Sequence, residues 1–278
     1  MVDERSASAF DPASVPVKDA STVMLVRDSV RGIEVFLLRR VVGMDFAGGM
    51  TVFPGGGVDR SDSEASLRWT GRDVEWWAKR FDVTPARAQA LVLAAVRETF
   101  EECGVLLAGR DPDSVLADTA PHAQARRQLE DRELSFSDFL TREGLVLRAD
   151  LLRPWARWIT PLGERRRYDT HFFVAAAPEG QNADGATSEA EQVLWQTPAE
   201  ALAHWKSGRS VLLPPTWAQL TDLSKYATVA EILAGDPEIP TIAPIMSRTD
   251  TGIHIAFDGD EGYYEDGGPH PWANRDDI

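Results

Sequence analysis

The sequence predicts an α/β fold in which a mixed sheet lies between helical layers. Three observations support this prediction. Short apolar runs are typical of strands, longer runs rich in Ala, Leu, Arg and Glu are typical of helices, and the two alternate along the chain. The chain has 278 residues, of which 43% are hydrophobic and 26% charged, and this is enough to build one substantial core.

The expected strands are apolar segments bounded by turn residues. Two of them, residues 20–26 and 34–38, are joined by a polar turn, and residues 50–53 form a third. Further strands are expected at residues 105–108, 155–160, 168–176 and 192–195. The apolar runs 242–246 and 253–257 could form a hairpin.

The expected helices carry recognisable start and stop residues. A short amphipathic helix is expected at residues 73–81, and a long one at 86–102, where Thr84 is the N-cap and Pro85 takes the first helical position. Others are expected at residues 123–131, at 135–143 between Ser135 and Gly144, at 198–205, and at 216–233 before Gly235.

Three glutamates on the long helix are the most informative residues for function. Glu98, Glu101 and Glu102 are spaced i, i+3 and i+4, so they share one helix face. Like charges this close repel one another, and a hard cation among them would relieve the repulsion. Mg²⁺ is the usual choice, because it takes a few carboxylates and completes its shell with water and substrate phosphates. The alternative is a solvated acidic face.

A glycine-rich corner precedes this helix, and Gly104 follows it where a left-handed C-cap belongs. The corner reads Val52-Phe53-Pro54-Gly55-Gly56-Gly57-Val58-Asp59. In this order, the strand, the glycine loop, the helix with three glutamates and the final glycine resemble the Nudix hydrolase box. The second half of that box matches at Arg97, Glu98, Glu101, Glu102, Gly104 and Val105, and its first half matches at Gly56.

The resemblance has two departures. Asp62 stands where the family has a glutamate, and a helical insertion at about residues 63–89 separates the two halves of the box. A box split in this way resembles the Nudix subgroup that contains the mammalian peroxisomal coenzyme A diphosphatase. Segments 158–161, 166–173 and 212–216 add to that likeness. The resemblance therefore implies a Nudix-type α/β/α sandwich with a helical insertion.

The resemblance also implies residue roles. Glu98, Glu101 and Glu102 would hold Mg²⁺ or Mn²⁺, and Arg97 would pair with a carboxylate and fix the helix against the loop. Gly55 and Gly56 would shape the turn beside the metal. The role of Asp62 stays open between a structural and a functional one. The general base would be a box glutamate or a glutamate from a distant loop.

For the distant base, Glu189 is the first candidate and Glu191 its rival.

Two arginine pairs are candidates for binding the phosphates of a substrate, or else are simply solvated. Arg39 and Arg40 end a strand near the glycine corner, and Arg166 and Arg167 precede another strand. Two further hypotheses concern neighbouring tryptophans and the cysteine. Trp76 and Trp77 are expected to pack against the long helix rather than cover a substrate, and the single Cys103 is expected to be a buried residue rather than a nucleophile.

Charge and composition exclude several classes of function. With 29 basic and 44 acidic residues, the net charge is −15, which disfavours non-specific nucleic-acid binding. The sequence has no run of 18 apolar residues, which argues against a membrane span. One cysteine cannot form an internal disulfide, and the N-terminus lacks an apolar segment, so we expect a cytoplasmic protein. The five histidines show no zinc-ligand spacing.

We expect a poorly ordered lead-in at residues 1–20, a Nudix domain at 21–235 and a C-terminal extension at 236–278. The expected activity is metal-dependent hydrolysis of a diphosphate bond in a nucleotide derivative. Coenzyme A or acyl-coenzyme A leads as substrate by resemblance. The alternatives are ADP-ribose, NADH or FAD, and a Nudix-fold binding module without turnover. The substrate is expected to be a small molecule, and family habit makes a homodimer plausible.

Overall fold

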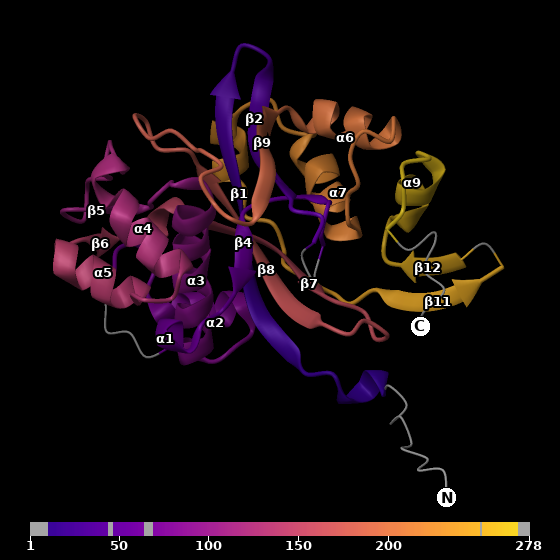
Figure 1. Ribbon diagram of the computed structural model, residues 1–278, viewed down its shortest axis with the longest axis horizontal. Coiled ribbons are helices and arrows are strands. Elements are labelled where there is room, and N and C mark those ends of the chain that lie inside the picture. Colours follow the sequence, from indigo (N-terminus) through magenta and orange to yellow (C-terminus); the bar gives the residue numbers. More distant parts are fainter. Residues whose placement is uncertain (1–10, 44–46, 64–68, 251, 272–278) are drawn as a thin grey trace, which may run out of the picture.

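The computed structural model describes residues 11–43, 47–63, 69–250 and 252–271. Within them lies one large sheet of eight strands (Figure 1). The strands are β1 (Val17–Ser29), β2 (Gly32–Arg40), β3 (Thr51–Val52), β4 (Gly55–Gly57), β7 (Arg153–Ile159), β8 (Arg167–Ala176), β9 (Ala190–Gln196) and β10 (Thr241–Ile242). Their order is β10-β7-β8-β1-β2-β3, with β4 paired to β1 and β9 paired to β2.

The sheet is mixed, as the sequence predicts. Strand β1 runs parallel to β8 and β10 runs parallel to β7, whereas the other pairs are antiparallel. Two small antiparallel pairs lie outside this sheet. One joins β5 (Ala108–Gly109) to β6 (Val146–Leu147), and the other is a hairpin of β11 (Ile245–Thr249) and β12 (Gly252–Ala256).

Helices cover both faces of the large sheet (Figure 1). The first group is α1 (Arg60–Ser63), α2 (Val74–Phe81), α3 (Pro85–Cys103), α4 (Ala123–Glu130) and α5 (Phe136–Glu143). The second group is α6 (Pro198–Lys206), α7 (Pro214–Leu223) and α8 (Val229–Ala234), and α9 (Asp260–Glu265) follows β12. The described residues also form the short 3₁₀ turns η1 (Pro12–Ser14), η2 (Ala120–His122) and η3 (Ala149–Leu151).

Alternation along β1 produces a separate core on each face. Val23 and Leu25 pack with the first helix group, whereas Met24 and Val26 pack with the second. Because successive side chains of a strand point to opposite faces, this is the pattern expected for a sheet buried on both sides. The α/β/α sandwich is thereby confirmed. No helix among the described residues is long and apolar enough to cross a membrane.

Helix α3 begins and ends as the sequence predicts. The Thr84 hydroxyl accepts a hydrogen bond from the Arg87 amide at 3.3 Å, and Gly104 ends the helix in the left-handed region with φ of 73°. The helix lies against β1, where the Ser21 hydroxyl donates to the Leu91 carbonyl at 2.7 Å. The same strand pairs with β4, so β1 holds the glycine corner and the glutamate helix in one place.

Three element predictions are corrected. The glycine corner is a short strand, β4, rather than a loop. Residues 105–107 are not a strand, because the side chain of Gln181 binds both the amide and the carbonyl of Leu106, in place of a neighbouring strand. The single helix predicted at 216–233 is two helices, α7 and α8, and Thr228 caps the second by accepting a hydrogen bond from the Glu231 amide.

The remaining boundaries differ only in detail. Strand β1 begins at Val17, inside the segment predicted to be a poorly ordered lead-in, and residues 1–10 of that segment lie outside the described residues. The predicted insertion contains α2, as expected, and its residues 64–68 lie outside the described part of the chain. Ile242, predicted to belong to the terminal hairpin, instead pairs with β7 as part of β10.

Candidate active site

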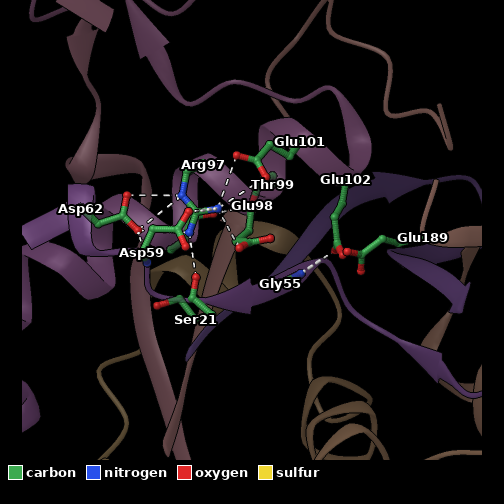
Figure 2. A network of polar contacts seen from close by, with 12 residues as sticks. Ser21, Gly55, Asp59, Asp62, Arg97, Glu98, Thr99, Glu101, Glu102 and Glu189 are labelled. Carbon is green, nitrogen blue, oxygen red and sulfur yellow. Dashed lines mark hydrogen bonds and ion pairs between the residues drawn. The ribbon is translucent and has the colours of Figure 1, made fainter. Parts of the chain in front are cut away.

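Arg97 connects the two halves of the split motif. Its side chain is 5% exposed, and its Nη2 donates to the Gly57 carbonyl at 2.7 Å and to the Asp62 carboxylate at 3.1 Å. Asp62 lies on α1 and is 1% exposed. Its carboxylate also accepts a hydrogen bond from the Asp59 amide at 2.9 Å. Arg97 therefore joins α3 to β4 and α1 (Figure 2), as expected. Asp62 is the buried carboxylate that pairs with its guanidinium.

The three glutamates of α3 meet at one cavity, which confirms that they share a helix face. The Arg97 Nη1 donates to Glu98 at 2.8 Å and to Glu101 at 3.4 Å, so both carboxylates turn toward this guanidinium (Figure 2). Glu102 turns the other way and accepts a hydrogen bond from the Gly55 amide at 2.7 Å.

Burial raises the pKa of each glutamate. The pKa of Glu101 rises to about 7, mainly because burial penalises its charged form, while Arg97 lowers it in part. Burial also raises the pKa of Glu98 and raises that of Glu102 well above its ordinary value, and the negative charge of Glu98 adds to the latter. A cation bound beside these carboxylates would lower their pKa values again, because a nearby positive charge favours the ionised form.

The glycine corner is shaped by close approach. A Cβ atom at Gly56 would lie 2.5 Å from the Glu98 carboxylate oxygen, and one at Gly55 would lie 2.5 Å from the Ser21 carbonyl oxygen. At Gly55 only glycine leaves room, because the close neighbour is backbone, whereas a side chain at Gly56 would displace the Glu98 carboxylate. Gly55 and Gly56 therefore let the backbone of β4 come within hydrogen-bond distance of the α3 carboxylates, as the motif predicts.

Glu189 reaches the same cavity from the segment before β9. Its carboxylate accepts a hydrogen bond from the Arg40 Nη2 at 2.7 Å, and the Arg40 Nη1 lies 3.7 Å from Glu102. The charge of Glu189 raises the pKa of both Glu98 and Glu102, which shows that it belongs to the same cluster. Its rival Glu191 is exposed on β9, beside an irregularity in the pairing with β2, and is not among the residues that line the cavity.

The other predicted arginines do not join this cluster. Arg39 is exposed and is the neighbour of Arg40 on a strand, where adjacent side chains point to opposite faces. Arg167 donates to the Thr160 carbonyl at 3.1 Å, in the β7–β8 hairpin. It pairs with Val17, roughly 13 Å along β1 from the level of Gly56. Arg166 precedes it, and neither lines the cavity.

Sequence reasoning missed five lining residues. They are Asp59, Leu129, Glu130, Arg132 and Thr187. Asp59 is the last residue of the glycine corner, so its position in the motif could have identified it. The others come from the end of α4 and from the segment before β9, which no local pattern connects to the box. Only the tertiary structure brings them to the glutamates.

The expectations for Trp76, Trp77 and Cys103 are confirmed. Trp77 is 1% exposed and packs with Trp76 and Phe81 in the core that contains α3. The Cys103 thiol is fully buried, and burial raises its pKa to about 12, so it is not a thiolate at neutral pH.

The carboxylates are suited to binding a divalent cation, although they do not form a complete coordination site by themselves. Among the described residues, no three Asp, Glu, His or Cys side chains already converge at metal-ligand distances. Mg²⁺ needs only one or two carboxylates, because waters and substrate phosphates complete its shell. Glu98 and Glu102 repel each other, and their side chains are only 12% and 5% exposed, so this pair is suited to the role, with Glu101 beside it.

Comparisons with known proteins agree with this geometry. The family model described as the NUDT19 Nudix domain matches residues 78–224, more than half of the chain. The acyl-coenzyme A diphosphatase NUDT19 of Gallus gallus is 29% identical over an aligned length of 202, and the match covers 64% of this chain and 53% of that protein. The match thus spans about half the length of the chicken relative. The protein of the same name from Homo sapiens is 27% identical over an aligned length of 280, and the match covers 84% of this chain and 73% of that protein.

A solved structure has the same fold. The crystal structure of a NUDIX hydrolase from Alicyclobacillus acidocaldarius superposes with a TM-score of 0.68 at 26% identity, covering 82% of this chain and all of that one. The matched family segment contains α3 with its three glutamates, and the structural likeness extends to the sheet that holds them. On the strength of the family match and the glutamate cavity, this chain belongs to the Nudix hydrolases, in the family of the NUDT19 Nudix domain.

Proposed function

We propose that the chain hydrolyses the diphosphate bond of coenzyme A or an acyl-coenzyme A, with Mg²⁺ or Mn²⁺ as cofactor. The observation that carries this proposal is the convergence of Glu98, Glu101, Glu102 and Glu189 on one cavity beside the glycine corner. The substrate class is supported by the relatives named acyl-coenzyme A diphosphatase. Cleavage of that bond would give adenosine 3′,5′-bisphosphate and a phosphopantetheine.

Glu98, Glu101 and Glu102 are the proposed metal-binding residues. A divalent ion held there would neutralise phosphate oxygens and lower the pKa of a water molecule. Arg97 sets the orientation of α3 relative to β4, since its guanidinium binds residues on both sides of the split motif. Gly55 and Gly56 keep this corner free of side chains, so that a phosphate can approach the carboxylates.

Glu189 is the proposed general base. It lines the cavity from outside the box, and its side chain is 44% exposed, so it can exchange the proton of an attacking water with solvent. Arg40 holds its carboxylate in place at 2.7 Å and would also lie close to a bound phosphate. Contacts of Arg39, Arg166 and Arg167 with a more distant part of the substrate stay predictions.

A substrate panel tests the proposal. The full chain is incubated with Mg²⁺ or Mn²⁺ and with coenzyme A, an acyl-coenzyme A, ADP-ribose, NADH or FAD, and the products are separated by chromatography. We expect coenzyme A or its acyl form to have the highest kcat/KM, and EDTA to abolish turnover. A higher kcat/KM for ADP-ribose, NADH or FAD would move the substrate assignment to that nucleotide.

Absence of cleavage for every member of the panel would instead favour a binding module. A cytoplasmic location and a homodimer also stay predictions. Gel filtration combined with light scattering would decide the oligomeric state.

A further inference from the structure

Helix α4 ends in a left-handed turn that is made by an arginine. Arg132 has φ of 59°. Its amide donates to the Leu129 carbonyl at 2.9 Å, and the next amide, of Glu133, donates to the Gln128 carbonyl at 2.7 Å. These two bonds define a Schellman motif with Arg132 at the position that glycine usually takes. A side chain with a Cβ is strained in this region of backbone space.

The other helices of this group show what the position normally prefers. Helices α3 and α5 end on Gly104 and Gly144 in the same left-handed region, and α2 ends on Asp82 with φ of 53°. Glycine has no steric penalty there, and aspartate tolerates the conformation through local hydrogen bonding. Arginine has neither advantage. Glycine at position 132 would therefore make the end of α4 more stable than arginine does.

The position of the Arg132 side chain suggests a role in binding. It is exposed and is one of the residues that line the cavity of Glu98, Glu101 and Glu189. Within the described residues, its guanidinium holds no hydrogen bond or ion pair. The other cation lining the cavity, Arg97, is buried and fully engaged with Asp62, Glu98 and the Gly57 carbonyl.

The end of α4 is also fixed relative to the site. Leu129 is 3% exposed and packs in the core beneath α3. The carboxylate of Glu130 accepts hydrogen bonds from the Ser188 amide and hydroxyl, both at 2.7 Å, and from the Thr187 hydroxyl at 3.1 Å. These bonds join α4 to the segment that carries Glu189. The backbone of Arg132 is therefore held at the cavity rather than left to move with a free loop.

We propose that Arg132 binds a phosphate group of the substrate at the mouth of the glutamate cavity. A phosphate that enters a site lined by carboxylates meets repulsion, and a guanidinium with free donors offsets it through charge-assisted, bidentate hydrogen bonds. This inference rests on the proposed diphosphate chemistry and adds a recognition residue outside the Nudix box. The strained backbone of Arg132 is then the cost of placing a cation at this point.

The backbone geometry allows an unusually clean test. Arg132→Gly removes the side chain and relieves the left-handed strain, so its midpoint of thermal unfolding should equal or exceed that of the wild type. Arg132→Lys keeps the positive charge but loses the planar guanidinium that can bind a phosphate with two hydrogen bonds. Two controls match the change: Asp82→Gly relieves the same kind of strain at α2, and Arg127→Ala removes an exposed charge from α4 outside the cavity.

Steady-state kinetics with coenzyme A and dephospho-coenzyme A give the first readout. We expect Arg132→Gly to raise KM roughly 10- to 100-fold, the loss of one charged hydrogen-bonding group, with a much smaller change in kcat. Arg132→Lys should fall between this variant and the wild type, and the two controls should keep the wild-type KM. If the KM of Arg132→Gly rises for both substrates, Arg132 contacts the diphosphate. If it rises for coenzyme A alone, Arg132 contacts the 3′-phosphate.

A binding measurement separates this inference from the proposed function. Isothermal titration with adenosine 3′,5′-bisphosphate needs no turnover, and Arg132→Gly should weaken its binding by a similar factor. If the wild type cleaves none of the panel but this loss of affinity is seen, the hydrolase assignment fails and the phosphate contact stands. If Arg132→Gly keeps both the KM and the affinity of the wild type, Arg132 is only a solvated arginine and the inference is overturned.

Discussion

The Nη2 atom of Arg97 lies 3.1 Å from the carboxylate of Asp62, although the two residues are 35 positions apart in the sequence. Helix α2 and the first turns of α3 lie between them in the described part of the chain. The insertion therefore splits the motif in sequence but not in space. A long insertion adds little loop-closure entropy, so a buried ion pair can hold its two ends together.

This pair predicts a large loss of stability when one partner is removed. Asp62→Ala removes the closest aspartate of the buried Arg97 guanidinium. Breaking a buried pair costs up to about 3–5 kcal/mol, and Glu98, which still accepts from Arg97 at 2.8 Å, keeps the loss toward the lower end of that range. Urea denaturation of the metal-free protein measures the effect. Asp258→Ala, at an exposed position, is the control and should stay within about 0.5 kcal/mol of the wild type. A loss as small as that of the control would show that the pair does not hold the motif together.

The two candidate bases make a matched pair of variants. Glu189→Gln should lower kcat by about 10²- to 10⁴-fold, because an amide cannot accept the proton of the attacking water. Glu191→Gln, two residues away and outside the cavity, should leave kcat near the wild-type value. Both are measured at saturating substrate and Mg²⁺. Wild-type turnover in both variants would move the base to a glutamate of α3.

Gly56→Ala tests the close approach of β4 and α3. The added methyl would lie 2.5 Å from the Glu98 carboxylate, and the side chain of Glu98 would have to turn away. We expect kcat/KM to fall by about 10²-fold, since a shift of about 1 Å in a catalytic group can have that effect. Gly43→Ala, where nothing lies within 4 Å of the new atom, should keep full activity. Equal activity of the two variants would contradict the assigned role of Gly56.

Stability in acid should depend on His171. This side chain is fully buried, and burial lowers its pKa to about 4; Asp169 and Asp19 raise it, and Arg157 and Arg87 lower it further. Between pH 6.5 and 4 the unfolded chain binds a proton that the folded chain refuses, so stability falls as pH falls through this window. From pH 7 to 5, the wild type should lose about 2 kcal/mol more than His171→Leu. Urea denaturation at both pH values measures the free energy of unfolding of each protein. An equal loss in the two proteins between pH 7 and 5 would refute this prediction.

Several predictions succeeded because their causes are local. The bounds of α3 follow from Thr84, Pro85 and Gly104, which act within one turn of the helix ends. The failures have tertiary causes. Residues 105–107 are apolar like a strand, but the distant Gln181 takes the backbone hydrogen bonds of Leu106. The break between α7 and α8 lets Val229 and Ile232 reach the core of the second sheet face, which no periodicity within 216–233 reveals.

The sequence by itself determined the chemistry of this protein. The spacing of Glu98, Glu101 and Glu102 places three carboxylates on one face wherever the segment is helical, because helix periodicity is a local property. Only the tertiary structure decided which other charges face them. Arg40 contacts Glu189 and Glu102, Glu189 lines the cavity whereas Glu191 does not, and Arg132, which follows α4, lines it as well. These placements depend on strand pairing and packing between distant residues, and such contacts leave no mark in the local pattern of a single sequence.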